Sequence, residues 1–70
     1  MKPWNLRSGV WVESDQGIGV RHWDRIAETE GWWIHLINAD GSTLAQIPED
    51  RCTNVRLARA SSIPAARIEH

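Results

Sequence analysis

The sequence predicts a small all-β domain, and three observations lead to that prediction. Apolar and polar residues alternate in several short segments, which is typical of half-buried strands. Turn residues separate these segments at hairpin spacing. No stretch of about ten residues repeats its apolar positions with a helical period. We therefore expect five short strands in a single domain over residues 1–70, with a core at 7–59 and a tail at 60–70.

The first hairpin is predicted from two alternating segments, residues 10–14 and 18–23, on either side of Asp15-Gln16-Gly17. A three-residue loop with glycine last suits a type I turn followed by a left-handed residue. It pairs Ser14 with Ile18, whereas a two-residue loop would put Glu13 beside Ile18 and interrupt the apolar face. The predicted inner face therefore contains Val10, Val12, Val20 and His22, and the outer face Trp11, Glu13, Gly19 and Arg21.

The second hairpin is predicted over residues 32–37 and 42–47, joined by a turn in Asn38-Ala39-Asp40-Gly41. Asp-Gly between alternating segments is a strong hairpin signal. A two-residue or a four-residue loop gives the same faces. One contains Trp32, Ile34, Leu36, Ala45 and Ile47, and the other Trp33, His35, Ile37, Leu44 and Gln46. The polar segment 24–31 between the hairpins is predicted to be an exposed loop.

Residues 48–52 begin with Pro48 and have the length of a single 3-10 turn. A fifth strand is predicted at 54–59, with Val55 and Leu57 pointing inward. In the tail, a short turn capped by Ser61 or Ser62 is expected, with Ile63 and Ile68 packing onto the fold.

The composition narrows the classes of function. The formal net charge is −1, from 8 Lys and Arg against 9 Asp and Glu, so no strong attraction to nucleic acid or anionic lipid is expected. Cys52 is the only cysteine, and the first residues lack the apolar segment of a signal peptide, so we expect a cytoplasmic protein without a disulfide. No apolar run is long enough to cross a membrane.

Two bent hairpins, a 3-10 turn and a short closing strand resemble a Src-homology-3-like small barrel. Closing the sheet would remove exposed strand edges. Residues 12–20, with Gly17-Ile18-Gly19, resemble the first hairpin of KOW and CarD-type barrels, and Ile63-Pro64-Ala65-Ala66-Arg67 resembles small bacterial and prophage proteins of unknown function. The resemblance implies a five-stranded barrel with a 3-10 turn before the last strand.

A second resemblance concerns Ala45-Gln46-Ile47-Pro48. It is similar to the active-pore strand of type II dihydrofolate reductases, which are tetrameric barrels. The tyrosine and the lysine-rich surroundings of that family are missing here, which argues against this enzymatic alternative.

The residues that could support catalysis or metal binding are far apart in the sequence. His22, His35 and Cys52 are isolated from one another, so we expect no metal site and no cofactor. The inward His22 is interpreted as a hydrogen-bonded boundary histidine. Cys52 has no neighbouring base, and we expect no catalytic residue and no enzymatic activity.

The outer face of the predicted sheet is too apolar for a solvated surface. We expect either the termini to cover it, through Trp4, Ile63, Pro64 and Ile68, or a protein partner or a second copy to bind it. The leading hypothesis is therefore a non-enzymatic protein-binding module. Its predicted binding residues are Trp11, Arg21, Trp23, Trp33, His35, Ile37 and Leu44.

Two alternatives remain open. A nucleic-acid-binding barrel would contact phosphates through Arg21, Arg25, Arg56 and Arg59 and stack a tryptophan on a base. An aromatic cage for a methylated cation, as in Tudor-like barrels, could use Trp23 and Trp32, although no Tyr or Phe completes it.

Overall fold

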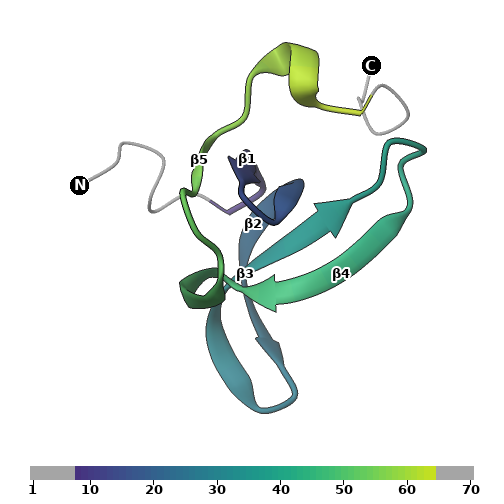
Figure 1. Cartoon of the computed structure of the whole chain (residues 1–70). Coiled ribbons are helices and arrows are strands. Elements are labelled where there is room, and N and C mark those ends of the chain that lie inside the picture. The colour runs from purple at the N-terminus through teal and green to yellow at the C-terminus, as the bar shows by residue number, and fades with distance from the viewer. Residues whose placement is uncertain (1–7, 65–70) are drawn as a thin grey trace.

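A computed structural model describes residues 8–64 of the chain, and these residues form strands and short 3-10 turns (Figure 1). The elements are β1 (Val10–Ser14), β2 (Gly17–Ile26), β3 (Thr29–Ile37), β4 (Thr43–Pro48), η1 (Glu49–Arg51), β5 (Arg56–Leu57) and η2 (Ala60–Ser62). No helix among residues 8–64 is long and apolar enough to cross a membrane.

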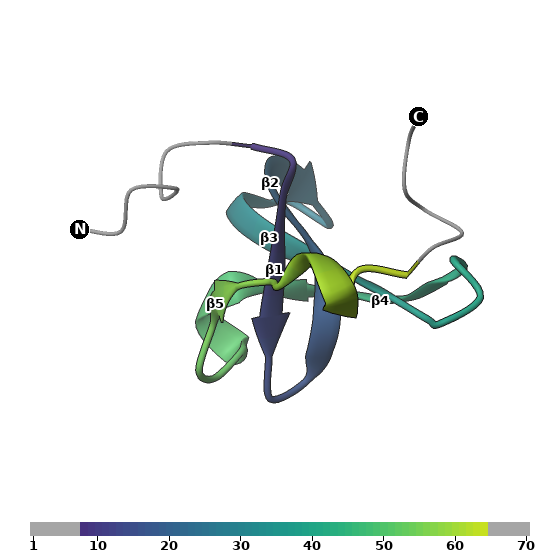
Figure 2. The same cartoon turned by 90° about the horizontal axis from the view of Figure 1, so that it is seen from above.

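The five strands form one antiparallel sheet with the order β4-β3-β2-β1-β5. The all-β prediction is therefore confirmed. β4 and β5 are the two edges of this sheet, and the described pairings do not join them into a closed barrel. Seen from above, β5 runs beside β1, on the side away from β4 (Figure 2).

The predicted register of the first hairpin is wrong by one residue. Ser14 pairs with Gly17, Glu13 with Ile18 and Val12 with Gly19, so the loop contains only Asp15 and Gln16. The Ser14 hydroxyl stabilises this short turn, because it accepts a hydrogen bond from the Gln16 amide and donates one to the Gly17 carbonyl. The shift reverses the faces of β2: Arg21 and Trp23 now share a face with Val12, whereas Val20 and His22 lie on the opposite face.

The segment 24–31, predicted to be a loop, is instead the end of a long hairpin. β2 and β3 continue to pair as far as Ile26 and Thr29, and only Ala27 and Glu28 form the turn. Both turn residues have positive φ, 51° and 67°, as in the type I′ turns that match the twist of paired strands. The sequence signal is missing because these positions usually contain Asn or Gly. The hairpin tip projects at the bottom of Figure 1.

The second hairpin has the predicted faces. Ile34 pairs with Ile47 and Leu36 with Ala45, and a register shift at Leu36/Ile37 leads into a turn at residues 38–42. Asp40 caps this turn, since its carboxylate accepts hydrogen bonds from the Ser42 amide and hydroxyl.

The last three elements, η1, β5 and η2, lie where they are predicted but differ from the prediction in detail. η1 lies within the predicted 3-10 segment, and β5 lies within the predicted fifth strand, although it is only 2 residues long. Val55 packs against the core as expected, whereas Leu57 is 49% exposed at the sheet edge. η2 forms in the tail without the predicted serine cap. Ile63 is half-buried, and the predicted packing of Ile68 lies outside the described residues.

The apolar core lies on the face of the sheet that contains Val12, Ile34 and Leu36, with relative exposures of 0%, 0% and 2%. Gly19 permits this packing because the backbone of the paired strand β3 lies very close to it. A Cβ atom at Gly19 would lie 2.1 Å from the His35 carbonyl oxygen. The second glycine of Gly17-Ile18-Gly19 is therefore required by strand packing.

Candidate functional site

The β2–β3 hairpin places chemically distinctive side chains on both of its faces, between Gly19 and the tip. One face has a group that we call the aromatic corner, which contains Arg21, Trp23, Trp32 and Glu49. The other face has the histidine cluster, which contains His22, Asp24 and His35. Both groups depend on the observed register, because residues two apart on β2 share a face.

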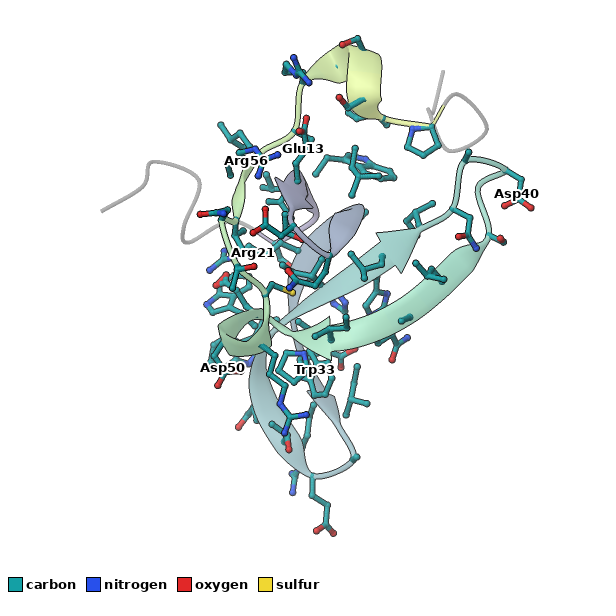
Figure 3. The ribbon with its side chains drawn as sticks, viewed as in Figure 1. Glu13, Arg21, Trp33, Asp40, Asp50 and Arg56 are labelled. Carbon is teal, nitrogen blue, oxygen red and sulfur yellow. The ribbon has the colours of Figure 1, made fainter. Side chains whose placement is uncertain are left out.

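Arg21 is the buried residue of the aromatic corner. Its side chain is 1% exposed, and its guanidinium forms a two-point ion pair with the Glu49 carboxylate of η1 through Nε–Oε2 and Nη2–Oε1, the latter at 3.1 Å. Its Cζ atom also lies 3.7 Å from the centre of the Trp32 ring. A buried guanidinium needs such partners, and together they fix β2, β3 and η1 relative to one another. Figure 3 shows Arg21 close to η1.

Trp23 is the exposed part of the aromatic corner. It pairs with Trp32 across the strands, and the two rings meet edge to face at 5.4 Å and 86°. Trp23 is nevertheless 54% exposed. This orientation is favourable for aromatic pairs, so the exposed ring is held by a neighbour that is itself fixed by Arg21.

The aromatic corner also bears on the cage hypothesis. Trp23 and Trp32 do meet, as an aromatic cage requires. However, the guanidinium of Arg21 already lies over the Trp32 ring. A methylated cation would have to compete with this internal cation for that ring.

The histidine cluster corrects the expectation that His22 and His35 are isolated. Their rings lie 3.9 Å apart, centre to centre, at an angle of 89°. Asp24 extends the cluster, with its Oδ2 atom 3.9 Å from His22 Nδ1. His22 is on the opposite face from the predicted one, and its Nε2 atom has no hydrogen-bond partner among residues 8–64.

The environment of His35 favours the neutral imidazole. Burial lowers the pKa of His35 below its ordinary value, and the neighbouring His22 lowers it further, while Asp24 acts in the opposite direction. His35 Nε2, like His22 Nε2, is a buried polar atom without a hydrogen-bond partner among the described residues.

The seven residues of the predicted binding face do not form one exposed surface. Arg21 is buried on the opposite face, and Trp33 and Ile37 are 7% and 5% exposed. Trp11 and His35 are half-buried, whereas Trp23 and Leu44 are 54% and 58% exposed but lie on different strands and on opposite faces. β3 is thus buried on both faces around Trp33 and Ile34, which single-face alternation does not predict.

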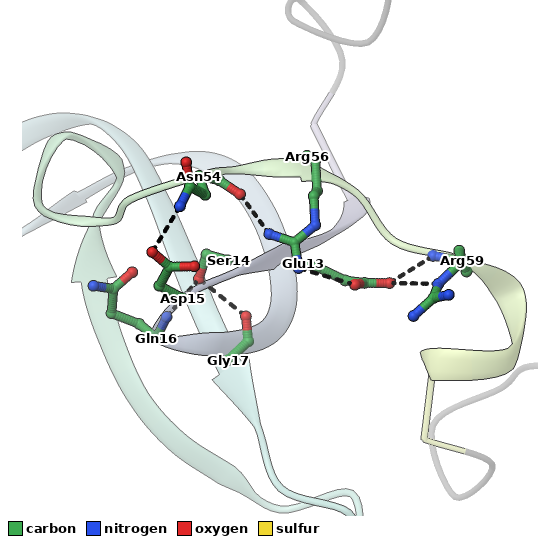
Figure 4. A network of polar contacts seen from close by, with 8 residues as sticks. All are labelled: Glu13, Ser14, Asp15, Gln16, Gly17, Asn54, Arg56 and Arg59. Carbon is green, nitrogen blue, oxygen red and sulfur yellow. Dashed lines mark hydrogen bonds and ion pairs between the residues drawn. The ribbon is translucent and has the colours of Figure 1, made fainter.

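The arginines of the nucleic-acid alternative are mostly engaged with carboxylates. Arg56 and Arg59 approach Glu13 at 3.4 and 3.8 Å, and the Arg59 amide also donates to Glu13 at 2.9 Å (Figure 4). The hydrogen bond from the Arg59 amide is the main cause of the lowered pKa of Glu13. Arg21 pairs with Glu49, and Arg25 is exposed near the hairpin tip. The four guanidinium groups therefore do not gather on one surface.

Two further residues were singled out from the sequence. Cys52 is half-buried against the core, and burial, followed by the charge of Glu49, raises its thiol pKa, so the neighbouring Arg51 does not activate it. Gln46, from the segment that resembles a reductase pore strand, is exposed on edge strand β4.

Sequence reasoning missed Glu49 and Asp24 as members of these clusters. Glu49 comes from η1, 28 residues after Arg21, and nothing in the local pattern indicates this contact. Asp24 was assigned to a loop. The spacing His22-x-Asp24 is a usable signal, because residues two apart share a face once the strand is known to continue.

Residues 8–64 enclose no pocket. No family model matches the chain, and no similar protein is found among curated proteins or solved structures.

Proposed function

We propose that the protein is a non-enzymatic interaction module that binds protein through the aromatic corner, and that its partner is a second copy of the chain. The observation that supports this proposal is Trp23, a tryptophan that is 54% exposed although it is held edge to face against Trp32. Tryptophan is enriched among the few residues that dominate binding energy at protein interfaces.

The aromatic corner is arranged for binding because its exposed ring rests on fixed neighbours. Trp32 contacts Trp23 on one side and the Arg21 guanidinium on another, and Arg21 is anchored by Glu49. A side chain that is already ordered loses little conformational entropy when it is covered by a partner.

The small core gives a reason for self-association. In the described part of the chain, the buried apolar residues are only Val12, Trp33, Ile34, Leu36 and Ile37. Domains of this size often gain stability from disulfides, metals or oligomerisation, and the single cysteine excludes an internal disulfide. Covering Trp23 would bury a large additional aromatic surface.

The strand order, with η1 directly before β5, supports a Src-homology-3-like fold as the finer description of this domain. In that interpretation the chain is a small interaction module of bacterial or prophage type. Nucleic-acid binding is less well supported, because three of its four proposed arginines face carboxylates.

The experiment is a concentration series of the full chain by light scattering and sedimentation. We expect a mass above that of one chain that falls on dilution. Replacing Trp23 with Ala should weaken the association by about thirtyfold, the effect of losing about 2 kcal/mol at a hot-spot residue.

Leu57→Ala is the matched control, since Leu57 is 49% exposed but lies on edge strand β5. It should leave the dissociation constant within a few-fold of wild type. A protein that has the mass of a single chain at every concentration, or that associates equally well without Trp23, would refute the proposal.

A further inference from the structure

The histidine cluster has the composition of a site for a transition metal. His22 and Asp24 lie two residues apart on β2, so their side chains share one face. Val20 pairs with His35 on β3, which places His35 diagonally across from His22 on that same face. Two adjacent strands therefore present two imidazoles and one carboxylate to the same point.

The distances are compatible with three side chains that bind one ion. One ligand atom from each of His22, Asp24 and His35 lies within 4.8 Å of the other two. Ligands of tetrahedral zinc, at 2.0–2.2 Å from the metal, are separated by roughly 3.3 Å. Small side-chain rotations would close this difference, and Asp24, with its side chain 44% exposed, has room to make them.

The two buried histidine nitrogens give independent support. Nε2 of His22 and Nε2 of His35 are shielded from solvent, and neither has a hydrogen-bond partner among residues 8–64. A buried polar atom without a partner is destabilising, so such atoms call for an explanation. The lone pair of a neutral imidazole is a metal ligand, and an ion bound through either Nε2 atom would give that atom the partner it lacks.

We propose that His22, Asp24 and His35 form a binding site for a divalent transition metal of the zinc class. Two imidazoles and a carboxylate match the ligand preference of zinc and its neighbours, whereas calcium and magnesium prefer oxygen ligands alone. The three side chains leave at least one coordination position for water or an external ligand. This proposal is independent of the aromatic corner, which lies on the opposite face of the hairpin.

The test is calorimetric titration of the metal-free full chain with zinc chloride, with cobalt absorption as a spectroscopic check. We expect one equivalent of zinc to bind, and cobalt to give the visible bands of a site with imidazole ligands. His22→Asn, His35→Asn and Asp24→Asn should each weaken zinc binding by at least about tenfold, since even the loss of a group that only supports a ligand costs 10–100-fold.

The chain offers controls of matched chemistry. His70→Asn removes the only other histidine in the sequence, Asp40→Asn removes an exposed aspartate from the β3–β4 turn, and Cys52→Ser removes the thiol. None of these three should change the zinc affinity. Circular dichroism of every variant establishes that it is folded, and Asp24→Asn, a near-isosteric change at a half-exposed position, is the variant least dependent on folding.

Absence of zinc binding to the wild-type chain would overturn the proposal. It would also be overturned if zinc binds but the affinity depends on His70 or Cys52 instead of the cluster. If only the two histidine variants bind weakly and Asp24→Asn binds as wild type, the three-residue site is rejected as stated. None of these results bears on the measurement of molecular mass with Trp23→Ala. The metal-site proposal and the self-association proposal can therefore be refuted independently.

Discussion

The two ends of the β2–β3 hairpin are stabilised by different kinds of interaction. At the end near Gly19, β2 pairs with β1, and the hairpin contributes to an apolar core in which Val12 and Leu36 are 0% and 2% exposed. In the tip end, which we take as the part from Arg21 to the turn, Arg21 is buried against Glu49 and Trp32, and His22 meets His35 on the opposite face. One end thus depends on close packing, and the other depends on specific polar and aromatic pairs.

The difference explains why candidate sites gather at the tip. A packed apolar end tolerates neither added volume nor polar groups. Beyond Arg21, β2 no longer pairs with β1, so this part can present Trp23 and Asp24 to solvent or a ligand, beside the half-buried histidines. Substitutions at the two ends should therefore lower the stability of the fold for different physical reasons.

The largest effect is expected at the packed end, from Gly19→Ala. The added Cβ would lie 2.1 Å from the His35 carbonyl oxygen and 2.9 Å from Leu36 Cα, and backbone atoms cannot move aside cheaply. We expect a loss of about 3 kcal/mol in the free energy of unfolding, measured by urea denaturation. Gly9→Ala, where nothing lies within 4 Å, should cost less, about 1–2 kcal/mol from its φ of +87° alone. Equal losses would contradict the packing argument.

At the tip end, Glu49→Gln tests the buried ion pair. The substitution removes the charge opposite Arg21 while keeping the size of the side chain. We expect a loss of about 2 kcal/mol, because hydrogen bonds to charged groups contribute about 1.5–3 kcal/mol. Tryptophan fluorescence should also change, since Arg21 lies over the Trp32 ring. Asp50→Asn, at the next and exposed position, is the control and should change stability by less than about 0.5 kcal/mol.

The histidine cluster should make the tip sensitive to acid. The pKa of folded His35 is lowered, so the unfolded chain binds its proton more readily than the folded chain. The stability that neutral His35 contributes is fully present above the ordinary histidine pKa of about 6.5. It is lost as the pH falls from there through the pKa of folded His35. His22 and Asp24 are the titratable groups that face His35 in this cluster.

Thermal unfolding of metal-free protein between pH 7.5 and pH 5 measures this effect. The midpoint should fall with pH in the wild type and fall less in His35→Gln. A parallel decrease in both proteins would assign the acid sensitivity to other groups.

The smallest effect is expected for Glu13→Gln, beside β5. Glu13 accepts a hydrogen bond from the Arg59 amide and faces the guanidinium groups of Arg56 and Arg59. The side chains of Arg56 and Arg59 are, however, 55% and 81% exposed. Exposed ion pairs contribute little. We expect a small decrease in the thermal midpoint at pH 7 and a weaker dependence on pH below about 4.5, because the lowered pKa of Glu13 contributes stability that acid removes. A decrease as large as that of Glu49→Gln would contradict the comparison between exposed and buried pairs.

The sequence alone determined the all-β class, the positions of most strands, the faces of the β3–β4 hairpin and the η1 turn. These follow from local alternation and from turn residues such as Asp40-Gly41 and Pro48, whose effects act over a few residues. Only the tertiary structure decided the register of β1–β2, the length of the β2–β3 hairpin and both candidate sites. A charged residue such as Arg21 can point inward only when a distant Glu49 and Trp32 receive it, and two histidines 13 positions apart meet only when strand pairing aligns them. Contacts of that kind depend on the whole sheet, which periodicity along one strand cannot reveal.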